Sequence, residues 1–329
     1  MKRISALIIT VMVVSIVGCK NKPKTDESNN TPVVSMESPA FDGDSAFAFV
    51  AAQTAFGPRV PGTKAHGECA TWMVNKLKSY TQNVIEQDFK ARLWDGKTAN
   101  GKNIIAVFNP ENKVRILLSA HWDSRPYADH DADAKNHKTP IDGANDGASG
   151  VGVLIEIARQ LSIKNPGIGV DIILFDLEDW GEPQEAQSEQ EDNWCLGSQH
   201  WSRTPHVVGY KARFGILLDM VGAANAEFAK EGTSMYYASD FVNKVWGIAN
   251  QLGFSNYFVN RQSNGITDDH LYINKIASIP TIDIVQHDPS TQSGFNQHWH
   301  TLNDNIGNIN KETLSAVGKV CLAVIYQEK

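Results

Sequence analysis

The chain has 329 residues, of which 42% are hydrophobic, and its formal net charge at pH 7 is −7. This length is sufficient for one large domain or two small ones, and the lack of a second polar linker in the sequence favours one. The acidic balance argues against nucleic acid as a binding partner.

The N-terminal segment has the features of an export signal followed by a tether. Lys2 and Arg3 precede an apolar run over residues 7–17, which is too short to span a membrane. The run ends at Gly18-Cys19, a pattern that resembles the lipobox of bacterial lipoproteins, in which cleavage precedes Cys19 and this cysteine is lipidated. We therefore expect an exported protein that is lipid-anchored to a bacterial membrane and faces the periplasm or the cell exterior. The predicted boundaries are 1–18 for the signal peptide, 19–38 for the lipidated cysteine and flexible tether, and 39–329 for the folded domain.

Helices and strands alternate along the remaining chain. Segments with apolar residues at helical spacing are separated by short runs of β-branched and aromatic residues. The predicted elements are helices over 45–55 and 65–80, strands over 84–89, 103–108 and 114–120, a helix over 149–161, strands over 170–176 and 214–219, a helix over 241–252, a strand over 281–284 and a helix over 313–326. This alternation predicts an α/β domain with a central twisted, mostly parallel mixed β-sheet that is flanked by helices.

Residues able to bind a metal follow several predicted strands. His121, Asp179 and Asp219 each lie at or just past a strand end, where the ligands of such sheets bind. The acids Glu178 and Asp179 are adjacent. If this segment is extended, the two side chains point to opposite faces, so that Asp179 can bind a metal while Glu178 moves protons.

Asp146, Asp179 and His300 together offer three ligands for a zinc ion with an open fourth position. Each residue alone has a simpler explanation, since an Asp before a helix usually caps it and a His beside a Trp usually packs. In the turn after Asp146 we expect Ser149 to cap the following helix. The cysteines predict no thiolate zinc site because no Cys-x-x-Cys spacing occurs. Besides Cys19 they are Cys69, Cys195 and Cys321, which allow at most one disulfide and one free thiol.

Three long irregular segments connect the elements, over 124–145, 181–193 and 284–300. Loops of this length in a compact domain are usually functional. The acidic, Gln-rich segment 181–193 fits either a substrate lid or a solvated surface excursion, and the sequence leaves both open.

Taken in order, these residues resemble the zinc-dependent aminopeptidase superfamily known as the M28 clan. Within it, the chain resembles the glutaminyl-peptide cyclotransferases, in particular their bacterial secreted members. The doubled acid Asp268-Asp269, Trp299 before His300 and the residues around Asp219 favour that group. One departure is that Asp179 stands where animal cyclases have a glutamate as metal ligand. The likeness rests on His121-x-Asp123, on Asp146 in Asn-Asp-Gly-Ala-Ser-Gly, on Glu178-Asp179, on Asp219 and on His300-Thr301.

The resemblance implies one zinc ion and a reaction in which N-terminal glutamine, and by extension N-terminal glutamate, of peptides or proteins becomes pyroglutamate. It also implies a monomeric catalytic domain. The implied roles are metal ligand for Asp146, Asp179 and His300, proton transfer for Glu178 with Asp219 and Asp268, substrate contact for Trp299, Trp180 and Trp194, and a network or second metal site for His121, Asp123 and Asp269. For Trp194, ordinary core packing is an equal alternative.

Two other functions stay open at this point. A di-zinc aminopeptidase would use His121, Asp146, Asp179, Asp219 and His300 as ligands and would activate water between the two metals. A surface-binding lipoprotein on an inactive peptidase scaffold is a third hypothesis. The presence of Glu178, which chemistry needs and folding does not, argues against it.

Overall fold

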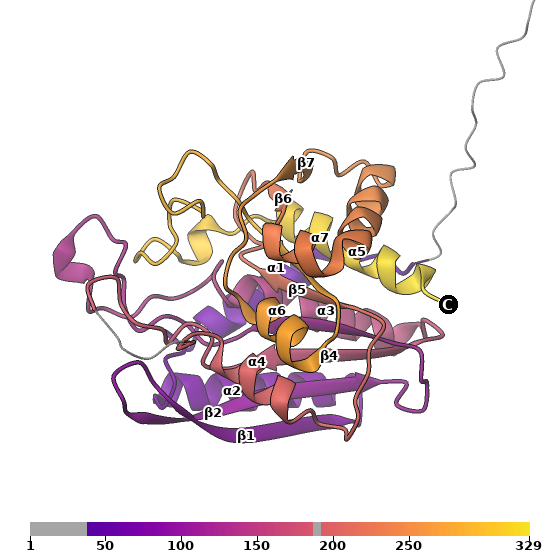
Figure 1. Ribbon diagram of the computed structural model, residues 1–329, viewed down its shortest axis with the longest axis horizontal. Helices are drawn as coiled ribbons and strands as arrows, with labels where there is room; N and C mark the ends of the chain where they lie inside the picture. The colour runs from indigo at the N-terminus through magenta and orange to yellow at the C-terminus, as the bar shows by residue number, and fades with distance from the viewer. Residues whose placement is uncertain (1–37, 187–191) are drawn as a thin grey trace, which may run out of the picture. The chain divides into compact units, whose positions relative to one another are not determined.

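A six-stranded mixed β-sheet forms the centre of the structure, a computed structural model that describes residues 38–186 and 192–329 (Figure 1). Its strands lie in the order β1-β2-β4-β3-β5-β8. The last four in this order are mutually parallel, whereas β1 and β2 form an antiparallel hairpin at one edge. The predicted mostly parallel sheet is confirmed. The strands are β1 (Val84–Arg92), β2 (Thr98–Phe108), β3 (Arg115–His121), β4 (Gly169–Phe175), β5 (Gly215–Asp219) and β8 (Thr281–Val285).

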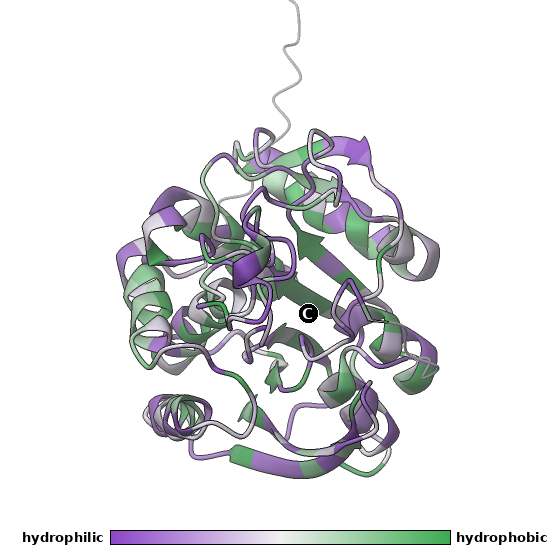
Figure 2. Cartoon of the chain, turned by 90° about the vertical axis from the view of Figure 1, so that its left-hand side faces the viewer, coloured by the Kyte–Doolittle hydropathy of each residue, from purple (hydrophilic) through white to green (hydrophobic). Residues whose placement is uncertain are grey.

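Alternate residues of the central strands enter two different cores, as the period of two in a β-strand requires. In β3, Ile116 and Leu118 join the larger core, while Leu117 joins the smaller one on the other face with Trp201. Figure 2 shows apolar strands inside and polar segments outside. Helices that contribute to the larger core are α1 (Gly43–Thr54), α2 (Lys64–Lys78), α3 (Ala148–Ile163), α5 (Gly232–Gln251) and α7 (Lys311–Gln327), and α4 (Leu196–Arg203) contributes Trp201 to the smaller one.

The helix predicted over 241–252 is longer in the structure. It begins at Gly232 because the Glu231 carboxylate caps it, accepting hydrogen bonds from the backbone N–H groups of Thr233 and Ser234. A non-helical residue, Ala238, interrupts the apolar spacing, which explains why the first part was missed.

Several short elements were not predicted, since each is too short to show a clear period. They lie mainly between β5 and β8 and beside the long loops. They are η1 (Ala134–Asn136), α4, the two-stranded parallel sheet of β6 (Phe228–Lys230) and β7 (Phe258–Gln262), α6 (Asp269–Tyr272), η2 (Ile273–Ala277) and η3 (Ile306–Asn308).

The described residues form one domain. None of the helices in this part of the chain is long and apolar enough to cross a membrane. Cys69, Cys195 and Cys321 are buried free thiols, so the disulfide that the sequence allowed is not formed. The predicted signal peptide, Cys19 and the tether up to residue 37 lie outside the described residues, as do residues 187–191 of the loop predicted as a lid or surface excursion.

Candidate active site

The carboxyl ends of the parallel strands bring acids and histidines together, as the sequence predicted. His121 ends β3 and Asp219 ends β5. Nε2 of His121 lies 3.0 Å from Oδ1 of Asp146 and 3.2 Å from Oδ1 of Asp219. Three separate segments of the chain therefore converge on one buried point.

The Glu178-Asp179 pair reaches this point by a different path from the one predicted. β4 ends at Phe175, and Leu177 has a φ of 58°, so the segment turns and is not extended. The side chains of Glu178 and Asp179 consequently line the same pocket, and the expectation of opposite faces was wrong. The Asp123 carboxylate fixes the turn by accepting hydrogen bonds from the N–H groups of Glu178 and Asp179, both at 3.1 Å. Asp123 is therefore part of a supporting network and does not line the pocket.

Asp146, Asp179 and His300 form a group that could hold a metal ion, with one ligand atom from each lying within 4.8 Å of the others. Nε2 of His300 is 3.2 Å from Oδ1 of Asp179 and 3.6 Å from Oδ2 of Asp146. Both oxygens of Asp179 and Oδ2 of Asp146 are buried and have no hydrogen-bond partner within the described residues. Buried carboxylate oxygens of this kind are costly unless a cation pairs with them, so the residues fit a zinc ion.

A second group shares Asp146 with the first. This group contributes three ligand atoms that also lie within 4.8 Å of one another, one each from His121, Asp146 and Asp219. Nδ1 of His121 faces Oδ1 of Asp123 at 3.5 Å, which orients the imidazole. The five residues that would bind two metals in an aminopeptidase are therefore all assembled.

Arg125 and Asp129 support the first group, and neither was predicted from the sequence. Arg125 is buried and donates two hydrogen bonds to the Asp129 carboxylate, at 2.8 and 2.6 Å, and one to the Asp179 carbonyl at 3.1 Å. Asp129 in turn lies 3.4 Å from Nδ1 of His300, and the Arg125 guanidinium lies over the Trp194 ring. This arrangement orients two metal-ligand candidates and one pocket wall. Nothing in one sequence marks an Arg-x-x-x-Asp pair as functional.

The turn that carries Asp146 is held from outside the helix that follows it. Ser149 does not cap α3, contrary to the prediction. Its buried hydroxyl donates to the Asn145 carbonyl at 2.5 Å and accepts from the Val221 N–H at 3.0 Å. The Asp304 carboxylate accepts from the N–H groups of Asn145, at 2.7 Å, and of Asp146, at 3.0 Å.

We expect Asp304→Asn to weaken zinc binding by about 10- to 100-fold. The amide NH2 group of this variant would face the backbone N–H of either Asn145 or Asp146, so one of these two hydrogen bonds would be lost. The turn that orients Asp146 would then be held less firmly. The measurement is a zinc titration at about pH 8, because burial and the Asp146 charge raise the pKa of Asp304 to about 7. The exposed Asp44→Asn is the matched control, and wild-type zinc affinity in Asp304→Asn would refute this role.

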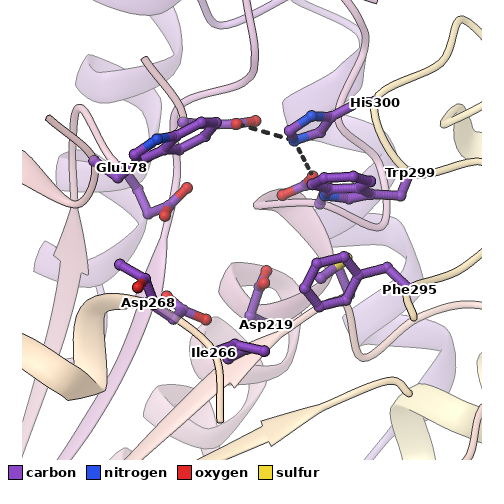
Figure 3. Close-up of a pocket in the computed structure, with 12 residues that line it drawn as sticks. Glu178, Asp219, Ile266, Asp268, Phe295, Trp299 and His300 are labelled. Carbon is purple, nitrogen blue, oxygen red and sulfur yellow. Dashed lines mark ion pairs between the residues drawn. The ribbon is translucent and has the colours of Figure 1, made fainter. Parts of the chain in front are cut away.

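Acidic and apolar side chains line the pocket together, and Trp299 and Phe295 lie opposite Glu178 and Asp268 (Figure 3). Trp299 stacks on His300, with ring centroids 3.8 Å apart, and Phe295 packs on Trp299. Trp194 also lines the pocket, which favours the wall over simple core packing. Trp180 does not line it. This indole packs against the small core of Phe89, Leu93, Leu177 and Leu196, so its prediction as a pocket wall is corrected.

Three pocket carboxylates, Glu178, Asp219 and Asp268, point toward the same opening (Figure 3). Burial, together with the charges of Asp179 and Asp268, raises the pKa of Glu178 well above its ordinary value, although His121 opposes this. Burial and nearby acids likewise raise the pKa of Asp219 to about 7. Carboxyl groups with raised pKa values are suited to exchanging protons near neutral pH.

The two adjacent acids Asp268 and Asp269 have different surroundings. Asp268 lines the pocket and also caps α6 by accepting a hydrogen bond from the Asp269 N–H. Asp269 is fully buried at the start of α6 and does not line the pocket.

Comparison with known proteins adds to this geometry. The family model described as peptidase family M28 matches residues 103–325. The crystal structure of a glutaminyl cyclase from Tannerella forsythia is 52% identical with a TM-score of 0.87, over 88% of this chain and 100% of that chain. That of a leucine aminopeptidase precursor from Bacteroides thetaiotaomicron is 51% identical with a TM-score of 0.86, over 89% of this chain and 100% of that chain.

A curated relative, the glutaminyl-peptide cyclotransferase of Bos taurus, is 26% identical over 258 residues, which are 68% of this chain and 65% of that protein. The chain spans 47% of the length of another curated relative, the aminopeptidase YwaD of Bacillus subtilis, and 65% of the length of the Bos taurus protein. The family model, in contrast, covers the four parallel strands of the central sheet and part of β2, and all the metal-ligand candidates lie inside the match. The chain belongs to peptidase family M28.

Proposed function

We propose that this protein is a glutaminyl-peptide cyclotransferase, which converts the N-terminal glutamine of peptides and proteins to pyroglutamate and releases ammonia. The observation that carries the proposal is one buried pocket that joins the proton-exchanging acids Glu178, Asp219 and Asp268 to the ligand group around Asp146. The names of the Tannerella forsythia and Bos taurus relatives agree with this reaction.

The candidate ligands of the pocket fit a zinc ion as cofactor. Asp146, Asp179 and His300, which line the pocket, would hold it. When bound, zinc supplies a Lewis acid that polarises the γ-amide oxygen of the substrate glutamine. Asp129 and Arg125 would keep His300 and Asp179 oriented for this task.

Glu178 is assigned the proton transfers. The α-amine of the substrate forms a bond to its own γ-carbonyl carbon, and Glu178 accepts the proton that this nitrogen loses. Glu178 then returns the proton to the γ-amide nitrogen as the carbon–nitrogen bond breaks and ammonia leaves. Asp219 and Asp268 line the same pocket as Glu178. The charge of Asp268 favours the protonated forms of both Glu178 and Asp219.

The aromatic rings of the pocket would hold the methylene stem of the glutamine. Trp299, Trp194 and Phe295 supply these rings, while the amide end of the substrate would lie beside the acids. Apolar walls with a few convergent polar groups are typical of small-ligand sites. They also exclude water, which intramolecular attack does not require.

The purified protein should be incubated with two peptides that differ only in their first residue, Gln or Leu. We expect ammonia release from the Gln peptide and about one zinc ion per chain. Release of free leucine with about two metals per chain would instead identify the protein as an aminopeptidase. Inactivity on both peptides would favour a binding function.

The aminopeptidase alternative has one specific observation in its favour. The group of His121, Asp146 and Asp219 is as close as the first group, so a second metal has a place to bind. The name of the Bacteroides thetaiotaomicron relative also points this way. In the proposed cyclase, His121 and Asp219 instead belong to the hydrogen-bond network around Asp146.

We also propose that the enzyme is exported and anchored through a lipid on Cys19, facing the periplasm or the cell exterior. The lipobox-like end of the apolar run and the polar tether that follows it support this proposal. The test is incorporation of labelled palmitate by bacteria that express the full chain. Cys19→Ala should lose the label, and an equally labelled variant would contradict the anchor.

A further inference from the structure

The carboxylate of Glu178 needs a fixed orientation for its proposed task. One oxygen must reach the two nitrogens of the substrate in turn, so a carboxylate free to rotate would spend little time in the productive position. What holds this side chain is a separate question from what binds the metal. The need for such a fixed carboxylate rests on the proposed function of Glu178.

The contact that holds Glu178 comes from Cys195. The Cys195 thiol donates a hydrogen bond to Oε1 of Glu178 at 3.1 Å. Within the described part of the chain, Cys195 is the one residue whose side chain donates a hydrogen bond to the Glu178 carboxylate. Oε2 of the same carboxylate lies 4.0 Å from Nδ1 of His121 and is left for the pocket.

The backbone around Cys195 is arranged to present this thiol. The Cys195 N–H donates to the Glu178 carbonyl at 3.0 Å, and the Leu196 N–H donates to the Leu177 carbonyl at 2.9 Å. Cys195 has a φ of 56°, and Leu177, across from it, has a φ of 58°. A left-handed backbone is unfavourable for a residue that carries a Cβ. Glycine would avoid this cost, yet it would carry no side chain to Glu178.

The thiol acts here as a donor. Cys195 is completely buried, and its burial, followed by the charges of Glu178 and Asp269, raises the pKa of the thiol well above its ordinary value. The sulfur therefore keeps its proton at neutral pH. A protonated thiol can donate a hydrogen bond and is a poor nucleophile.

We propose that Cys195 is a positioning residue that fixes the Glu178 carboxylate by holding Oε1, so that Oε2 exchanges protons with the substrate. The role concerns the chemical step and not the binding of substrate, because Cys195 does not line the pocket. Loss of the hydrogen bond therefore lowers kcat and leaves KM nearly unchanged.

The experiment compares three variants of the zinc-loaded protein on a Gln peptide. Cys195→Ala removes the donor, Cys195→Ser keeps a donor at nearly the same place, and Cys321→Ala removes an equally buried thiol in α7, remote from the pocket. We expect Cys195→Ala to lower kcat about tenfold, which is the loss of one hydrogen bond to a charged group. Cys195→Ser should recover most of this loss, and Cys321→Ala should keep the wild-type kcat.

The outcomes are distinct from those that test the proposed function. Wild-type kcat in Cys195→Ala would overturn the positioning role, as would a Cys195→Ser variant as slow as Cys195→Ala. Failure of the wild-type protein to form pyroglutamate would instead overturn the proposed reaction. The same variants would then be compared on the Leu peptide, where an unchanged kcat in Cys195→Ala would again refute the positioning of Glu178.

Discussion

Replacing Glu178 by Gln is expected to reduce turnover of a Gln peptide by about 10²- to 10⁴-fold, because the amide cannot carry the proton from the attacking to the departing nitrogen. The two side chains have nearly the same shape, and the amide oxygen can still accept the Cys195 hydrogen bond. The fold and the zinc content should therefore stay as in the wild type. The measurements are steady-state kinetics, circular dichroism and metal analysis on the same sample.

The exposed Glu185→Gln is the matched control, since it makes the same chemical change outside the pocket. It should retain wild-type turnover. A fully active Glu178→Gln would remove the proton-transfer role and, with it, the main support for the proposed mechanism.

The second large effect is expected from the two histidines on either side of Asp146. His300→Ala should lose the zinc ion and at least about a hundredfold in turnover, because a Lewis acid contributes several kcal/mol to such a reaction. His121→Ala should keep about one zinc per chain, since His121 belongs to the second group and the cyclase does not fill it. Both side chains are buried, so the pair is matched for the cavity that truncation creates.

Metal content and turnover of the two variants distinguish the functions. A wild type with two metals, of which each variant loses one, would contradict the single-zinc account and support a di-zinc aminopeptidase. Chelation of the wild-type protein should abolish turnover, and added zinc should restore it.

The parts of the site that follow strands could be predicted from the sequence. Runs such as 114–120 have strong β propensity, and the rule that ligands bind at the carboxyl ends of parallel strands places His121 and Asp219 correctly. The sheet itself followed from the alternation of elements, and the five helices found by period agree with the structure apart from the early start of α5.

Backbone turns were the parts that the sequence did not reveal. The left-handed Leu177 redirects Glu178 and Asp179 into one pocket, and leucine carries no sign of such a conformation. The same turn sends Trp180 into the small core beside Leu93, while Trp194 takes the place at the pocket. A choice between two tryptophans depends on this path and not on composition.

Supporting contacts were invisible for a related reason. Arg125, Asp129 and Asp304 act through pairings between segments far apart in the chain, and a single sequence does not show which residues meet. In the sequence, Cys195 is only one of three scattered cysteines besides Cys19. Its contact with Glu178 depends on the turn at Leu177, so no local pattern could have indicated it.

The most direct test of the proposed cyclase is mass spectrometry of a Gln peptide after incubation with the zinc-loaded protein in water enriched in heavy oxygen. Intramolecular attack predicts a product that is lighter by one ammonia and contains no oxygen from the solvent. A shortened peptide, with heavy oxygen in the released amino acid, would contradict the cyclase and show that the pocket activates water.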